Sequence, residues 1–167
     1  GQNSDTISNM AIQPTDQWTE LLKVIQPDRD TVSGKWTLED GALVSDKDSV
    51  AKLRIPCVLP EEYDFAIEFT RKGNDAVGQV LTKNGVQFGW LMGGWGNSGF
   101  CLFNKKAGSP RSSDNKSQVS RPLLTNARYS SVVQVRNDHV RVLVDGIEVI
   151  RYKTDYTDLE PSWAELK

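Results

Sequence analysis

The stretch His139–Ile150 reads HVRVLVDGIEVI and decides the fold class. Val140, Val142 and Val144 occupy alternate positions, so they point to one face of a β-strand. Asp145-Gly146 is a tight-turn signal, and the residues after it begin a return strand. The stretch therefore predicts a β-hairpin. Similar alternating segments closed by turns recur through most of the chain, which predicts an all-β sandwich.

Other segments carry the same signals. Residues 63–71 alternate most clearly and place four aromatic or aliphatic side chains on one core face: Tyr63, Phe65, Ile67 and Phe69. Asp40-Gly41 predicts a hairpin over residues 34–44, and Lys83-Asn84-Gly85 predicts another between residues 77–82 and 86–92. The remaining predicted strands are residues 50–55, 100–104, 126–136 and 140–152.

The rest of the chain is more irregular. Residues 1–16 are polar and predict a flexible lead-in, followed by a single β-sandwich domain over residues 17–167. The spacing of apolar residues from Trp18 to Ile25 predicts one short helix that ends before Pro27. Residues 105–120 predict an exposed loop, and the tail predicts packing through Tyr156, Leu159 and Trp163.

Composition limits the partners. The chain has 167 residues and a formal net charge of -2, with acidic and basic residues interspersed. No basic surface for nucleic acid is therefore expected. No apolar run approaches the roughly 20 residues that span a bilayer, so no membrane insertion is expected.

The chain contains two cysteines, Cys57 and Cys101. Each lies in or beside an apolar segment, as expected of free thiols that pack like small hydrophobic groups. A disulfide between them stays open as an alternative if their strands are neighbours, and it would favour an oxidising compartment. Their number and spacing do not suggest a metal site.

Several motifs resemble the concanavalin A-like lectin/glucanase superfamily: Trp36, Glu39-Asp40-Gly41-Ala42-Leu43, Tyr63-Asp64-Phe65, Glu68-Phe69 and the late Val144-Asp145-Gly146. Within it the chain is most similar to the 3-keto-disaccharide hydrolase domain and the related laminin-G-like modules. The resemblance implies a jelly-roll sandwich of two antiparallel sheets, with carbohydrate on a concave face or in rim loops, and an extracytoplasmic location. Asn97-Ser98-Gly99 follows one hairpin later than in the hydrolase family.

Sugar recognition needs a flat apolar platform together with planar amide or guanidinium groups. Two central hairpins and one earlier strand supply both, and the predicted ligand-binding residues are Trp95, Trp90, Asn97, Arg54, Gln79 and Gln87. Trp95 stands between glycines and predicts a surface position. Trp90 is in phase with Val86 and Phe88, so a core position is its alternative. Arg111 is a candidate to close over a ligand.

The sequence assigns no catalytic residue. Glu62, Asp64 and Glu68 share one strand face, but Asp64 and Glu68 are separated by roughly 13 Å, whereas a retaining glycosidase pair needs about 5 Å. A solvated outer face is the expected role of these carboxylates. His139 is the single histidine and lies beside a turn, so neither a serine-hydrolase triad nor a multi-histidine metal site is expected.

Four oxygen-bearing residues are candidate ligands for a structural calcium ion, although their spacing matches no loop motif: Asp46, Asp48, Asp114 and Asn115. No other cofactor is expected. The leading hypothesis is a noncatalytic carbohydrate-binding module, within a larger multidomain protein, that recognises a poly- or oligosaccharide. The alternatives are a glycoside hydrolase acting on a 3-keto-disaccharide or related glycan, and a protein-interaction or adhesion module.

Overall fold

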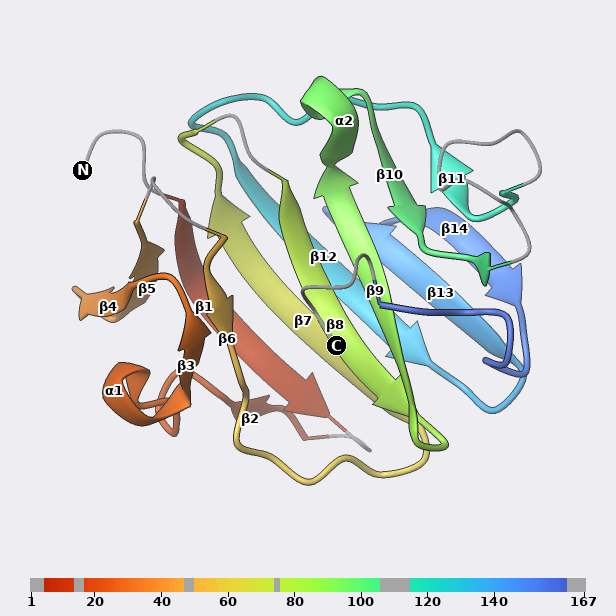
Figure 1. The fold of residues 1–167 in the computed structure, drawn as a ribbon, viewed down its shortest axis with the longest axis horizontal. Helices are drawn as coiled ribbons and strands as arrows, with labels where there is room; N and C mark the ends of the chain where they lie inside the picture. Colours follow the sequence, from red (N-terminus) through yellow and green to blue (C-terminus); the bar gives the residue numbers. More distant parts are fainter. Residues whose placement is uncertain (1–4, 14–16, 47–49, 74–75, 106–114, 162–167) are drawn as a thin grey trace.

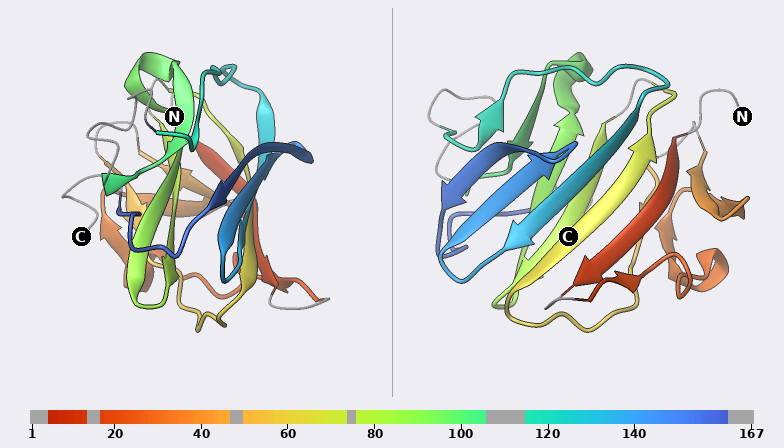
Figure 2. Two further views of the ribbon diagram at one scale, coloured as in Figure 1. Left: turned by 90° about the vertical axis from the view of Figure 1, so that its right-hand side faces the viewer. Right: turned by 180° about the vertical axis from the view of Figure 1, so that it is seen from behind.

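The computed structural model describes residues 5–13, 17–46, 50–73, 76–105 and 115–161. These residues form an antiparallel, β-sandwich-like all-β architecture, as the alternating sequence pattern predicted (Figure 1). Two layers of strands face each other. The left view of Figure 2 shows β8 to β10 in one layer and β12 to β14 in the other.

In the described part of the chain, one layer is an eight-stranded sheet, here called the large sheet. Its order is β14-β13-β12-β7-β1-β5-β4. In addition, β2 pairs with Ala11 and Ile12 near the C-terminal end of β1. Its strands are β1 (Thr6–Gln13), β2 (Thr19–Glu20), β4 (Trp36–Glu39), β5 (Ala42–Ser45), β7 (Tyr63–Thr70), β12 (Arg128–Val135), β13 (His139–Val144) and β14 (Ile147–Lys153).

The opposite layer has two parts within the described residues. A four-stranded sheet, the small sheet, has the order β11-β10-β9-β8, and a separate two-stranded sheet joins β3 to β6. The strands are β8 (Val77–Lys83), β9 (Val86–Gly93), β10 (Gly99–Leu102), β11 (Gln118–Val119), β3 (Thr31–Ser33) and β6 (Lys52–Leu53). Two helices of four residues each, α1 (Pro27–Asp30) and α2 (Gly94–Asn97), complete the described elements.

The tight turns confirm the hairpin predictions. Asp40-Gly41, Asn84-Gly85 and Asp145-Gly146 each join two paired antiparallel strands. Both residues of each turn have positive φ, between 51° and 79°. A two-residue turn with this backbone matches the right-handed twist of the strands that it joins. These local signals therefore fix the three hairpins β4–β5, β8–β9 and β13–β14.

The predicted lead-in is wrong for residues 6–13, which form β1. This strand pairs with β7 on one side and with β5 and β2 on the other, so it lies inside the large sheet. Met10 and Ile12 point into the core and are 4% and 7% exposed. A register shift between Ile7 and Asn9 interrupts the alternation. This irregularity explains why residues 6–13 look unstructured in the sequence.

The helix predicted from Trp18 to Ile25 is also wrong. Residues 19–20 form β2, and residues 21–24 are bend and turn. The helix α1 begins at Pro27, the residue that was expected to end the preceding helix. Proline lacks the backbone N–H that the first helical turn leaves unpaired anyway, so it suits that position. The apolar spacing reflects Leu21 and Ile25, which are buried in the core without a helix.

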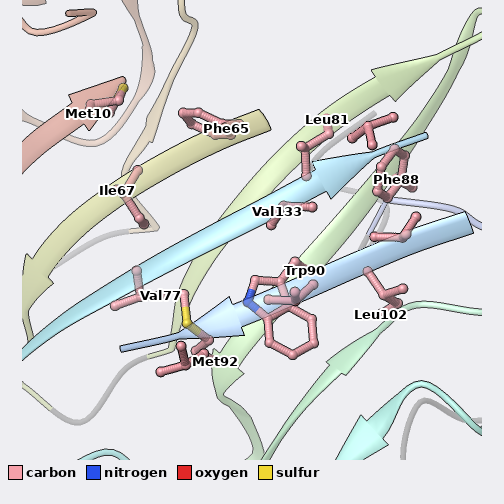
Figure 3. Close-up of a cluster of buried hydrophobic side chains, with 14 of the residues drawn as sticks. Met10, Phe65, Ile67, Val77, Leu81, Phe88, Trp90, Met92, Leu102 and Val133 are labelled. Atoms are coloured by element: carbon pink, nitrogen blue, oxygen red, sulfur yellow. The ribbon is translucent and has the colours of Figure 1, made fainter. Parts of the chain in front are cut away.

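The core lies between the two layers (Figure 3). The large sheet contributes the predicted face of β7 together with valines of β12 and β13, and the small sheet contributes Leu81, Phe88, Trp90, Met92 and Leu102. Gln79 bridges the layers, because its Nε2 donates to Phe65 O and its Oε1 accepts from Ser131 Oγ. Both ends of the Gln79 amide therefore have a hydrogen-bond partner, as burial of an amide requires.

The predictions for residues 50–55, the C-terminal tail and the cysteines are confirmed in part. The strand predicted over residues 50–55 contracts to β6, and the predicted tail contact is confirmed for Tyr156 and Leu159, both 0% exposed. Trp163 lies outside the described residues. Cys57 and Cys101 are both free thiols, as expected; packing as a small hydrophobic group is confirmed for buried Cys101 and is wrong for Cys57, which is exposed. No helix among the described residues is long and apolar enough to span a bilayer.

Candidate functional site

The outer face of the large sheet carries a row of polar side chains across five strands. Strand register places Gln13 beside Asp64, Asp64 beside Gln134, and Gln134 beside Arg141. Arg141 in turn lies opposite Arg151 of β14. Residues directly opposite each other in antiparallel strands share a face. The five residues therefore form one continuous row, here called the polar row.

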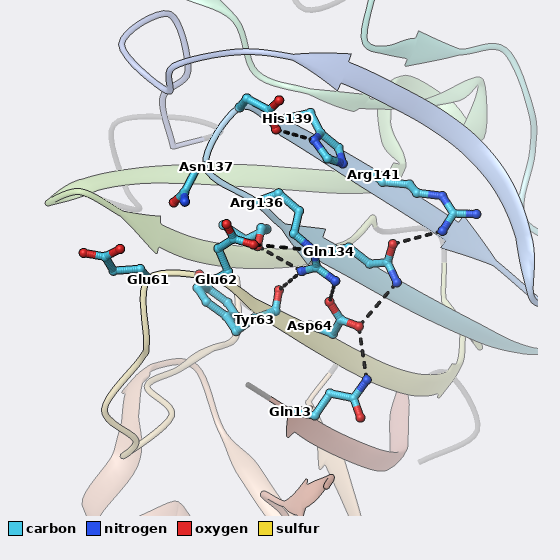
Figure 4. A network of polar contacts seen from close by, with 12 residues as sticks. Gln13, Glu61, Glu62, Tyr63, Asp64, Gln134, Arg136, Asn137, His139 and Arg141 are labelled. Carbon is cyan, nitrogen blue, oxygen red and sulfur yellow. Dashed lines mark hydrogen bonds and ion pairs between the residues drawn. The ribbon is translucent and has the colours of Figure 1, made fainter. Parts of the chain in front are cut away.

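Hydrogen bonds lock the polar row into one arrangement (Figure 4). Gln13 Nε2 and Gln134 Nε2 donate to the same oxygen of Asp64, Oδ2, at 3.2 and 3.3 Å. Arg141 Nη1 donates to Gln134 Oε1 at 3.2 Å. Because each side chain holds its neighbour, planar amide, carboxylate and guanidinium groups are fixed before any ligand arrives.

Asp64 is the buried centre of this network. Its side chain is 7% exposed, and Arg136 Nη2 lies 2.7 Å from its Oδ1. Arg136 also donates to the carbonyl oxygens of Tyr63 and Val135, and its Nε lies 3.9 Å from Glu62 Oε2. A buried carboxylate needs a close charge partner and hydrogen bonds, and Asp64 has both. The solvated role expected for Asp64 is therefore wrong.

Glu148 anchors the other end of the polar row. Its Oε1 accepts from Arg141 Nε at 2.6 Å and from Arg151 Nε at 3.0 Å. These hydrogen bonds, first that from Arg141, lower the pKa of Glu148 from its ordinary value of 4.5. The carboxylate therefore stays ionised at neutral pH and orients both guanidinium groups.

A low strip runs beside the polar row, one outward-facing position further along each strand. Ala11 lies opposite Ala66, Ala66 opposite Val132, and Val132 opposite Leu143. Rows two residues apart are separated by roughly 6.6–6.8 Å. On the far side of the strip, Glu68 pairs with Arg128 at 2.6 Å. Small and aliphatic side chains thus lie between two polar borders, and we call the whole surface the polar face.

The residues proposed from the sequence do not share one exposed surface. Trp90 and Gln79 are 1% and 2% exposed and belong to the interior between the layers. Asn97 donates to Leu123 O and accepts from Leu123 N, so both ends of its amide are occupied. Trp95 belongs to α2, and its side chain is outside the described part of the structure.

Two of the proposed residues are accessible but lie apart from these. Arg54 is exposed after β6, and Gln87 is exposed on β9. Arg54, Gln79, Gln87 and Trp90 all contribute to the lining of a cavity of about 930 Å³ between the layers. Arg111 falls outside the described residues. The cavity is therefore a feature that all four of these residues share, while Gln79 and Trp90 are also direct partners in the β8–β9 pairing.

Most of the polar row was not predictable from the sequence. Asp64 stood out in the sequence, whereas Gln13, Gln134, Arg141 and Arg151, and Glu148 beside them, did not. One signal was present in the hairpin at residues 139–150, where Arg141 alternates with the buried valines. This alternation does not show which residues of other strands lie beside Arg141. That depends on strand register, because the row joins side chains 51 and 70 residues apart in sequence.

The carboxylates that the sequence singled out, Glu62, Asp64 and Glu68, each lie beside an arginine. Arg136 lies between Glu62 and Asp64 and contacts both, and Glu68 is held by Arg128. His139 Nδ1 lies 2.7 Å from Asp138 Oδ1, and this contact lowers the pKa of Asp138. The histidine thus pairs with its chain neighbour at the start of β13.

The calcium candidates are only partly visible. Asp48 and Asp114 lie outside the described residues, whereas Asn115 is buried and donates to Leu102 O at 3.0 Å. Within the described part of the chain, no group of three or more metal-ligating side chains is close enough to hold an ion. No protein-family model, curated protein or solved structure matches this chain.

Proposed function

We propose that this chain is a noncatalytic carbohydrate-binding module and that the polar face of the large sheet binds the glycan. The observation that carries the proposal is the hydrogen-bonded row Gln13–Asp64–Gln134–Arg141 beside the strip of alanine and aliphatic residues. We extend the proposal to the finer fold and location that the superfamily resemblance implies, a jelly roll acting outside the cytoplasm.

The chemistry of the polar row suits sugar hydroxyl groups. A hydroxyl group both donates and accepts, so it pairs with an amide on either side, with a carboxylate as acceptor and with a guanidinium as donor. Because these groups are already ordered, binding a sugar costs little additional side-chain entropy. The bonds to Asp64, Arg141 and Arg151 are charge-assisted and therefore stronger than neutral ones.

The strip suits the apolar face of a pyranose ring. Ala66 is short and only partly buried, so a ring is able to approach the sheet there between the longer side chains on either side. The described floor is aliphatic instead of aromatic, and it lacks the additional attraction of an aromatic platform. We therefore expect weak binding, with a Kd of about 0.1–1 mM, which corresponds to about 4–5.5 kcal/mol.

We do not expect catalysis on this face, because its carboxylates are wrongly spaced for a glycosidase. A retaining mechanism needs two carboxyl groups about 5–5.5 Å apart, one of them able to donate a proton. The carboxylates here are each tied to an arginine, and Asp64 and Glu68 are separated by four positions of one strand. A glycan is therefore expected to leave the surface unchanged.

Titration calorimetry against a panel of neutral oligosaccharides, with a product assay alongside, tests the proposal. Arg141→Ala and Gln134→Ala are expected to weaken binding, the former roughly tenfold or more because it loses a charge-assisted bond. Gln87→Ala is the matched control, since this glutamine is exposed on the opposite layer. Equal affinity in all three variants would place the site elsewhere, and product formation would favour the hydrolase alternative.

A further inference from the structure

The layer opposite the large sheet is interrupted. β8 pairs with β9 and β6 pairs with β3, but within the described residues no pairing joins β6 to β8. Figure 1 shows β3 and β6 over one end of the large sheet and β8 to β10 over the rest. The cavity of about 930 Å³ lies at this interruption and has lining residues from β1, β6, β7 and β8.

The floor and the rim of the cavity are both largely apolar. Met10, Phe65 and Val77 line its floor and retain 4–9% exposure. Val32 and Val50 also line the cavity and are 58% and 57% exposed, so apolar surface continues from the interior to solvent. The volume falls within the roughly 300–1,000 Å³ typical of small-molecule sites, which are likewise mainly apolar.

Two hydrogen-bond donors in the lining have no partner among the described residues. They are the indole N–H groups of Trp36 and Trp90, both buried. Buried polar groups are almost always paired, so each unpaired donor calls for a partner. The neighbouring polar groups do not supply one, because Gln79 bonds to Phe65 and Ser131, and the Tyr63 hydroxyl bonds to Thr82.

We propose that this cavity binds an elongated, mostly apolar small molecule that carries acceptor oxygens, such as a ketone, ester or ether, which accept from Trp36 and Trp90. Both unpaired groups are donors, so the buried part of the ligand presents acceptors only. The rim contains Asp5 and Asp46 as well as Lys52 and Arg54, which favours a ligand without net charge. This site is independent of the polar face, which lies on the opposite side of the large sheet.

A matched pair of probes tests the chemistry. Acetylnaphthalene and ethylnaphthalene have similar size and shape, but the first carries a ketone oxygen. We expect the ketone to bind roughly two- to tenfold more tightly, the effect of one net hydrogen bond. In proton–nitrogen correlation spectra, the ketone is expected to shift the indole signal of the tryptophan that donates to its single oxygen, Trp36 or Trp90. Trp36→Phe and Trp90→Phe assign the two signals.

Variants locate the probe. Leu53→Trp places a larger ring in the lining and is expected to abolish binding of both probes. Leu38→Trp is the matched control, because Leu38 is 44% exposed and does not line the cavity. Trp36→Phe and Trp90→Phe each keep an aromatic ring and remove the N–H. The variant at the tryptophan whose indole signal shifts is expected to lose the preference for the ketone and to bind ethylnaphthalene as the unmodified chain does.

Three results would overturn the proposal: no binding of either probe to the unmodified chain, equal binding to Leu53→Trp, or equal affinity for the ketone and the hydrocarbon. Circular dichroism shows whether Leu53→Trp retains its strands. If that variant does not fold, the indole shifts in the unmodified chain still decide the location. Oligosaccharide binding is measured separately, so failure of either proposal leaves the other standing.

Discussion

At the scale of single residues, Asp64 is the buried centre of the polar row, so it is expected to contribute to stability. It is buried on the outer face of a sheet, and Arg136 holds it at 2.7 Å. Arg136→Ala leaves this carboxylate without its charge partner and is expected to lower the free energy of unfolding by about 2–3 kcal/mol. Urea denaturation measures the change. Arg128→Ala is the control, because its ion pair is exposed and is expected to contribute about 0–1 kcal/mol; equal losses would contradict the assignment.

Glu148 predicts a pH dependence for the polar face. Its pKa is lowered by hydrogen bonds from Arg141 and Arg151, so its charge persists below pH 4.5. The stabilising contribution of the ionised Glu148 carboxylate is fully present above pH 4.5. It is lost as the pH falls through the lowered pKa of the folded state. A carbon-detected NMR titration is expected to place its midpoint below 4.5, and oligosaccharide affinity is expected to be constant from about pH 8 to 5. In Glu148→Gln the acid-induced weakening is expected to be smaller.

The thiols are expected to react at different rates. Burial raises the pKa of Cys101 to about 12, whereas Cys57 is exposed. The thiolate is the reactive species, so Cys101 is nearly inert near pH 8. A chromogenic disulfide reagent is expected to modify one thiol in the folded chain and the second only after denaturation. Cys57→Ser removes the fast phase; two fast thiols in the folded chain would contradict the burial of Cys101.

At the scale of elements, β1 determines whether the large sheet holds together. It lies between β5 and β7, and its Met10 side chain is buried against the core. Met10→Ala is expected to cost about 2–5 kcal/mol because it leaves a cavity. Asn9→Ala, on the exposed side of the same strand, is expected to change stability by no more than about 0.5 kcal/mol. Thermal or urea unfolding distinguishes β1 from the loose segment that the sequence suggested.

Elements with complete local signals were predictable. The turn pairs at 40–41, 84–85 and 145–146 combine a tight turn with alternation on both sides, and β7 alternates over its whole length. β1 lacks this regularity because of its register shift between Ile7 and Asn9. Pro27 was ambiguous in principle, because proline both ends a preceding helix and begins a new one.

At the scale of the whole molecule, the polar face is assembled through long-range strand pairing, which a single sequence does not reveal. The hairpin turns determine which neighbours pair locally, but β1, β7 and β12 meet through long connections. Gln13 and Gln134 reach Asp64 only in one register of three distant strands. A slip of one residue in any of them would send the side chain to the opposite face. Residue type alone therefore could not identify the row.

The shared central strands predict a single unfolding transition. β1 and β7 lie in the middle of the large sheet, between the hairpin β4–β5 at one edge and the hairpin β13–β14 at the other. The inner faces of these strands belong to one core. Circular dichroism and tryptophan fluorescence are expected to give coincident urea curves. Two separated transitions would instead divide the chain into independently stable halves, contrary to the continuous core.

The position of β1 also bears on how the chain acquires its structure during translation. β7 leaves the ribosome about fifty residues after its partner β1, and β12 completes the other edge of β7 only after residue 128. At the usual rate of roughly 5–20 residues per second, β1 waits several seconds for β7. The nascent chain thus exposes unpaired strand edges throughout that interval, which gives chaperones a defined period in which to act.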